Sequence, residues 1–155
     1  MSLGMSETSA PKPVSSRPIS VPTARAVSVR HWMTPTPHSV GKEQPLSVAQ
    51  RLMRENGVRH LPVLEHGKLV GIISERDLLF VQAITGVDLA STKVEDAMTQ
   101  SVYCVPPEQR LRAVVAEMAE HRYGCAVIVE GAKVVGVFTT TDALDVLAHH
   151  LAKDL

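Results

Sequence analysis

The chain has few aromatic residues and no excess of either charge. The first shortage limits how the core can be built, and the second excludes two classes of partner. Aromatic residues make up 3% of the 155 residues, so a core must be built from aliphatic side chains and methionine. The 16 basic and 16 acidic residues give a formal net charge of +0. A dedicated nucleic-acid or anionic-membrane surface needs a basic excess, so neither partner is expected.

Cysteine pairs, histidine pairs and long apolar runs are also missing. Cys104 and Cys125 have no paired spacing, so we expect two apolar thiols rather than a disulfide framework or a zinc knuckle. The seven histidines never recur at a metal-binding helical spacing, and no metal is expected. No run approaches the ~18 apolar residues of a membrane span, and the N-terminus lacks a signal-peptide core. We therefore expect a cytoplasmic protein.

What is present is an internal repeat. A shift of 65 residues, without gaps from about residue 29 to 81, superimposes the following pairs: Met33-Thr34 on Met98-Thr99, Gly71 on Gly136, and Asp77 on Asp142. Such a period indicates one supersecondary unit used twice, and two such units normally pair to close one core. A hydrophobic content of 45% is enough to fill that core.

The pattern divides the chain into a tail and two repeats. Residues 1–27 are rich in Ser, Pro, Ala and Thr and predict a disordered tail, whose start is compatible with a cloning remnant. Residues 28–87 and 92–151 form the repeats. Each predicts a short extended piece, near Val40 or Val105, followed by helix, strand, strand and helix. Helices are expected from Pro45 to the cap at Gly57, from Ser74, over 110–121 and near 141–150, with strands over 60–64, 69–73, 125–129 and 134–138.

The polar signal lies where the last strand of each repeat meets the following helix. Gly71-Ile-Ile-Ser74-Glu-Arg-Asp77 corresponds to Gly136-Val-Phe-Thr139-Thr-Thr-Asp142. A helix N-terminus favours a phosphate, the hydroxyl can contact phosphate or sugar, and the aspartate can accept from both hydroxyls of a ribose. The alternative is purely structural, because Ser or Thr followed three residues later by an acid is also a helix cap. The same motif at two equivalent corners is typical of a paired ligand cleft.

The segment Gly57-Val58-Arg59-His60-Leu61-Pro62-Val63, followed by Gly71 to Asp77, resembles the cystathionine β-synthase (CBS) domain, and the whole chain resembles a tandem pair, or Bateman module. The second repeat departs from the family pattern. Its segment 122–127 lacks the histidine and the proline, although Gly136 to Asp142 is intact. The resemblance covers about residues 28–150. It implies an α/β (α+β) fold, with two pseudo-symmetric β-α-β-β-α repeats packed sheet to sheet.

The resemblance also implies a regulatory module that binds AMP, ADP or ATP, with NAD or S-adenosylmethionine as alternative ligands. Each of two sites would take its hydroxyl and aspartate from one repeat and its base contacts from the other. One site would hold Ile72, Ser74 and Asp77 with Thr99, Tyr103 and Tyr123. The other would hold Val137, Thr139 and Asp142 with Thr34, His38 and Val58.

Two arginines make the expected sites unequal. Arg59 and Arg76 are the best phosphate partners, because a guanidinium can hold phosphate through two hydrogen bonds. Repeat two has Gly124 and Thr141 at the corresponding positions. The Asp77 site is therefore expected to bind phosphate more strongly than the Asp142 site.

No nucleophile, base or metal set stands in a catalytic arrangement, so an enzyme is not expected. We expect a stand-alone module that forms a homodimer and signals to a separate, unidentified effector protein. The apolar helix positions Leu78, Leu79, Val81, Leu144, Val146 and Leu147 are candidates for the dimer contact or for the core. The rival functions are a dimerisation scaffold without ligand and a nucleotide hydrolase.

Overall fold

The computed structural model describes residues 27–35, 37–84 and 86–153. The predicted disordered tail, Val27 apart, lies outside the described residues. The predicted order of elements in each repeat is confirmed. Repeat one contains β2 (Val40–Gly41), α1 (Leu46–Asn56), β3 (His60–Glu65), β4 (Lys68–Ser74) and α2 (Glu75–Gln82). Repeat two contains β5 (Cys104–Val105), α3 (Leu111–His121), β6 (Cys125–Glu130), β7 (Lys133–Thr139) and α4 (Thr140–Leu151).

Three further short elements were not predicted: strand β1 (Thr34–Pro35) and two 3-10 helices, Val29–His31 and Val94–Asp96. Each spans two or three residues, which is too short for an apolar period to identify. They lie at the start of the two repeats, in segments that we call the lead-in segments.

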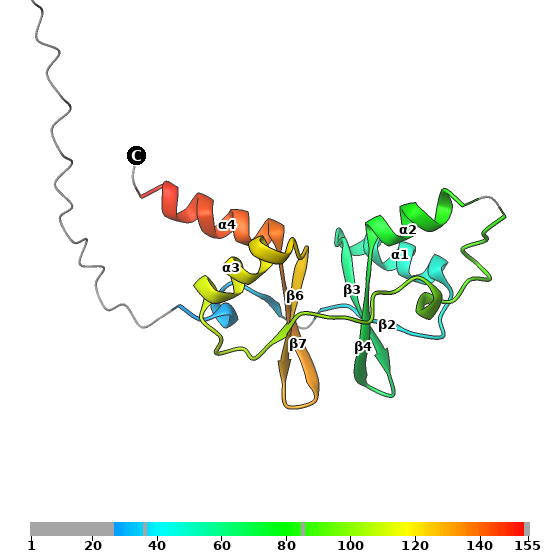
Figure 1. Ribbon diagram of the computed structural model, residues 1–155, viewed down its shortest axis with the longest axis horizontal. Helices are drawn as coiled ribbons and strands as arrows, with labels where there is room; N and C mark the ends of the chain where they lie inside the picture. Colours follow the sequence, from blue (N-terminus) through cyan, green and yellow to red (C-terminus); the bar gives the residue numbers. More distant parts are fainter. Residues whose placement is uncertain (1–26, 36, 85, 154–155) are drawn as a thin grey trace, which may run out of the picture.

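The strands form two sheets, one with the order β2-β3-β4 and one with the order β1-β7-β6-β5. In both, an antiparallel hairpin is extended by a short parallel strand, β2 on β3 and β5 on β6. Figure 1 shows the two hairpins side by side at the centre, with α1 and α2 beside one and α3 and α4 beside the other. This is the predicted α+β arrangement of two similar halves.

The first helices of the two repeats bury the same face. In α1 the buried residues are Leu46, Ala49 and Met53, and in α3 they are Leu111, Val114 and Met118. Positions i, i+3 and i+7 lie on one side of a helix, so each helix packs one apolar stripe against its own half. The two resulting cores are almost wholly aliphatic, with Phe138 as the largest fully buried side chain.

The lead-in segments are exchanged between the halves. Thr34 in β1 pairs with Val137 in β7, while Thr99 bridges Ile72 in β4. Likewise, Val29 is fully buried in the core of repeat two. Val94 is fully buried in the core of repeat one. Each sequence repeat therefore supplies the segment that completes the other half.

Two glycines permit this exchange. A methyl group on Gly71 would lie 2.6 Å from Met98 Sδ and 3.0 Å from the carbonyl oxygen of Thr99. A methyl group on Gly136 would lie 2.5 Å from Met33 Sδ and 3.0 Å from the Thr34 carbonyl oxygen. Both glycines are required for close approach rather than for backbone freedom.

Helices α2 and α4 leave large apolar side chains on the surface. The exposed set is Leu79, Phe80, Leu144, Leu147 and Leu151. In contrast, Leu78 is buried, and Val81 and Val146 are half-buried against the cores. Within the described ranges, none of the helices combines the length and hydrophobicity needed to cross a membrane.

Candidate functional site

A cleft of about 1320 Å³ separates the two halves and is lined by both. It is lined by all but one of the residues predicted from the sequence. These residues are Thr34, Val58, Arg59, Ile72, Ser74, Arg76, Asp77, Thr99, Tyr103, Tyr123, Val137, Thr139 and Asp142. His38 is the exception, because its side chain is exposed and does not line the cleft. The structure thus brings both predicted groups into one continuous space.

The first polar corner is a helix cap that faces the cleft. The carboxylate oxygen Oδ2 of Asp77 accepts hydrogen bonds from the backbone N–H and the hydroxyl of Ser74, each at 2.8 Å. The N–H of Asp77 in turn donates to Ser74 Oγ at 3.1 Å. This reciprocal arrangement is a capping box, so the structural interpretation of the motif is correct.

The second corner repeats this geometry. Asp142 Oδ2 accepts from the N–H of Thr139 at 2.8 Å and from its hydroxyl at 3.1 Å, and the Asp142 N–H donates to Thr139 Oγ1 at 3.3 Å. In both corners the described residues provide hydrogen bonds to only one carboxylate oxygen. The other oxygen, Oδ1, can accept from a ligand while the cap stays intact, so capping and binding are compatible.

Beside each corner, the backbone of a lead-in segment from the other repeat forms part of the cleft wall. Ile72 and Thr99 donate to each other's carbonyl oxygen, both at 2.9 Å. On the other side Thr34 lies opposite Val137 in the β1–β7 ladder. These are the pairs that the sequence assigns to the Asp77 and Asp142 sites, respectively.

Aromatic rings are concentrated at one part of the cleft. Tyr103 stacks on Tyr123 with ring centroids 5.3 Å apart, and His121 stacks on Tyr123 at 5.2 Å. Both tyrosines of the chain line the cleft. Burial raises the pKa of Tyr103, so its ring stays a neutral, largely apolar surface. A flat aromatic surface suits contact with a planar base.

Three arginines and three carboxylates share the cleft lining: Arg59, Arg76, Arg122, Glu75, Asp77 and Asp142. Arg59 Nε lies 3.5 Å from Glu75 Oε2, in a pair that is largely exposed and therefore weak. Among the described residues, Arg76 and Arg122 have no carboxylate oxygen within 4.0 Å. Arg122 is not among the site residues predicted from the sequence, although the 65-residue shift places it on Gly57.

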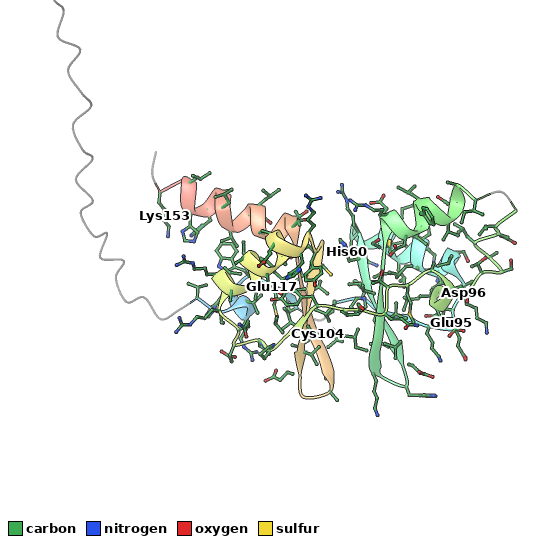
Figure 2. The ribbon with its side chains drawn as sticks, viewed as in Figure 1. His60, Glu95, Asp96, Cys104, Glu117 and Lys153 are labelled. Atoms are coloured by element: carbon green, nitrogen blue, oxygen red, sulfur yellow. The ribbon has the colours of Figure 1, made fainter. Side chains whose placement is uncertain are left out.

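Two further cleft residues were also missed, His60 and Gly124. A methyl group on Gly124 would lie 2.8 Å from His60 Nε2, so the ring contacts the opposite repeat closely. His60 Nδ1 is buried without a hydrogen-bond partner among the described residues. Burial lowers the pKa of His60, and the ring stays neutral near pH 7. Figure 2 shows His60 between the two halves.

Neither cysteine has the features of a reactive group. Cys125 lines the cleft, and burial raises the pKa of its thiol to about 12. Cys104 is exposed as a residue, but partial desolvation of its thiol also raises its pKa. Both thiols are free, which agrees with the expectation that no disulfide framework exists.

A candidate metal group lies outside the cleft, on α3. Ligand atoms of Glu117, Glu120 and His121 lie within 4.8 Å of one another. Glu120 and His121 are exposed, and His121 Nε2 is 3.1 Å from Glu117 Oε1. Solvated helix faces commonly carry such i,i+4 pairs, so this group gives no sign of a metal centre.

Comparison with known proteins identifies the fold family. Residues 29–83 and 94–149 each match the CBS domain. The chain is 32% identical over 117 residues to inosine-5'-monophosphate dehydrogenase of Korarchaeum cryptofilum, covering 74% of this chain and 23% of that enzyme. It is 29% identical to the CBS domain-containing protein YhcV of Bacillus subtilis, covering 74% of this chain and 81% of YhcV.

A solved structure extends the comparison to three dimensions. CBSX2 in complex with AMP has 26% identity and a TM-score of 0.70, covering 79% of this chain and 97% of CBSX2. The chain belongs to the CBS-domain family, and its two matched segments make it a tandem CBS module. It spans less than a quarter of the length of the dehydrogenase, which it matches only in part.

Proposed function

We propose that the chain is a regulatory module that binds an adenosine-containing nucleotide, AMP, ADP or ATP, in the cleft between its repeats. The observation that carries the proposal is the presence of two equivalent hydroxyl–aspartate corners on one cleft. Each corner combines a helix N-terminus, which favours a phosphate, with a free carboxylate oxygen, which can accept from ribose hydroxyls. CBSX2, whose fold this chain shares, holds AMP.

The two halves of the cleft are proposed to bind with different strengths. The Asp77 half would consist of Ile72, Ser74 and Asp77 with Thr99, Tyr103 and Tyr123, and the Asp142 half of Val137, Thr139 and Asp142 with Thr34 and Val58. Arg59 and Arg76 both line the cleft from repeat one, so the Asp77 half is the better phosphate site. The stacked tyrosines favour a base there as well.

NAD and S-adenosylmethionine remain the alternative ligands, because both contain the same adenosine unit that the corners would recognise. The lining arginines distinguish ligands by phosphate. NAD, AMP, ADP and ATP all carry phosphate groups that a guanidinium can hold, whereas S-adenosylmethionine carries none. The arginines of the cleft therefore favour a phosphate-containing ligand over S-adenosylmethionine.

Signalling is proposed to occur through assembly. The exposed apolar side chains of α2 and α4 lie on helices that begin at the two corners, so a ligand at either corner would contact the start of a helix that carries them. A homodimer formed through these faces would transmit ligand occupancy to a separate effector protein. The ligand would act by its differential affinity for two arrangements of the repeats. The module itself is proposed to have no catalytic activity.

The test is a thermal-shift panel of AMP, ADP, ATP, NAD, NADH and S-adenosylmethionine. A ligand at a hundredfold excess over Kd stabilises the folded state by about 2.7 kcal/mol, which raises Tm by several degrees. We expect the nucleotides to raise Tm, and phosphate release from ATP with magnesium to stay at background. Absence of any shift would favour the dimerisation scaffold instead.

A further inference from the structure

The two first helices end in the same backbone conformation but with different residues. Helix α1 ends at Gly57 with φ 62° and ψ 31°, and α3 ends at Arg122 with φ 57° and ψ 38°. In each case the backbone N–H of this residue donates to the carbonyl oxygen of a buried methionine, Met53 or Met118. The fold therefore requires a left-handed residue at both positions.

Glycine adopts this conformation without strain, whereas arginine does so with a clash between its Cβ and the backbone. Among the described residues, only His66 and Arg122 have positive φ without being glycine. Strained backbone that persists is concentrated at binding sites, where the side chain has a use that outweighs the conformational cost. Arg122 lines the cleft, and this makes its strain informative.

The surroundings of Arg122 are those of a cation without a protein partner. Its side chain is exposed, and among the described residues no carboxylate oxygen lies within 4.0 Å of its guanidinium. Arg59, on the opposite wall, has Glu75 nearby. A guanidinium that lines a cleft and has no carboxylate within salt-bridge distance can bind an anion through two hydrogen bonds.

Arg122 also gives a positive charge to the wall of the cleft that repeat two forms. Repeat one supplies Arg59 and Arg76, whereas the equivalent positions of repeat two are Gly124 and Thr141. Of the arginines and lysines in the described cleft lining, Arg122 is the one that comes from repeat two. A ligand with several negative charges could then be held from both walls.

We propose that Arg122 is a phosphate-binding residue of the second wall, so that a nucleoside di- or triphosphate is held by guanidinium groups of both repeats. This inference rests on the proposed nucleotide-binding function and extends it to the ligand's charge. It selects ADP and ATP over AMP. It also gives a reason for an arginine at the α3 cap, where the α1 cap has a glycine.

The test compares adenosine and ATP binding, by calorimetry, in the wild type and in Arg122→Gly and Arg122→Lys. Loss of a charged hydrogen-bond donor should weaken ATP binding about tenfold or more in Arg122→Gly. Adenosine affinity should stay within about twofold. The free Arg122→Gly protein should have a raised Tm, because glycine relieves the strain. Arg122→Lys keeps the positive charge but loses the paired donors, so its ATP affinity should lie between those of the wild type and Arg122→Gly.

His66→Gly is the matched control. His66 has φ 49° in the turn between β3 and β4 and does not line the cleft. Its replacement should raise Tm without changing ATP affinity. Equal losses for adenosine and ATP in Arg122→Gly, or no loss for either, would overturn the assignment of Arg122. A wild type that binds neither adenosine nor ATP would refute the proposed function, and the assignment with it.

Discussion

Ile72 and Thr99 donate to each other's backbone carbonyl, both at 2.9 Å, although they belong to different sequence repeats. Thr34 and Val137, also from different repeats, lie opposite each other in the β1–β7 ladder on the other side. Each half of the cleft is thus assembled from both repeats, and neither half is complete when one repeat stands alone. A change in how the repeats meet would alter both halves of the cleft together.

Gly71→Ala tests the close approach behind the Ile72–Thr99 pairing. The new methyl would lie 2.6 Å from Met98 Sδ and 3.0 Å from the Thr99 carbonyl oxygen, so the lead-in segment must move. We expect the free energy of unfolding, from urea titration, to fall by about 1–3 kcal/mol. Gly41→Ala is the control, since its methyl would meet nothing closer than 3.4 Å. Equal effects of the two substitutions would contradict the role of Gly71.

His60 predicts a pH dependence of stability. Burial lowers its pKa in the folded state, with Arg59 and Arg76 acting in the same direction and Asp77 opposing them. Below about pH 6.5, His60 is therefore protonated more in the unfolded state than in the folded state. The free energy of unfolding decreases as the pH is lowered, until the pH reaches the pKa of His60 in the folded state. His60→Gln should lose less stability than the wild type between pH 7.5 and 5.5. The other histidines are common to both proteins, so an identical loss would refute this explanation.

The cysteines should differ in reactivity towards a thiol reagent at pH 8. Burial raises the pKa of Cys125 to about 12, which leaves only about one thiolate in ten thousand. Cys104 is exposed. We expect Cys125→Ser to react like the wild type, and Cys104→Ser to react only after denaturation. Rapid labelling of the folded Cys104→Ser protein would show that Cys125 is more accessible than the structure indicates.

The apolar faces of α2 and α4 should control assembly. Leu79 and Leu144 are 60% and 64% exposed, so glutamate can replace either without entering a core. If the proposed homodimer uses these faces, Leu144→Glu should convert dimer to monomer in light scattering, with Tm little changed. Lys133→Glu, at the exposed start of β7, is the control. A dimer that persists in Leu79→Glu and Leu144→Glu would place the contact elsewhere.

Local signals predicted most of the fold from the sequence. The apolar spacing of Val48, Ala49, Leu52 and Met53 and the cap at Gly57 predicted α1, and the repeat transfers the same elements to the second half. The exchange of lead-in segments could not be derived from spacing, because Val29 and Val94 fit either core equally well by pattern. It depends on tertiary contacts, such as the Met98–Gly71 and Met33–Gly136 approaches, that the order of residues does not show.

The sequence predicted those site residues whose positions are set by local backbone structure. Ser74, Asp77, Thr139 and Asp142 lie at helix starts, where local geometry fixes their side chains. His38 shares a repeat position with Tyr103, yet it does not line the cleft, because repeat equivalence does not fix side-chain surroundings. The alignment of the repeats places Arg122 opposite Gly57, but the proposed role of Arg122 depends on its left-handed backbone conformation, which the sequence does not show.

The most direct measurement is a calorimetric titration of AMP into the wild type, Asp77→Ala, Asp142→Ala and the double variant. Asp145→Ala, on the exposed surface of α4, is the control for loss of a carboxylate. We predict a larger loss of affinity in Asp77→Ala than in Asp142→Ala, and no detectable binding in the double variant. Each variant must first show a folded Tm, because loss of a capping box costs about 1 kcal/mol. Undiminished AMP binding by a folded double variant would contradict the central claim.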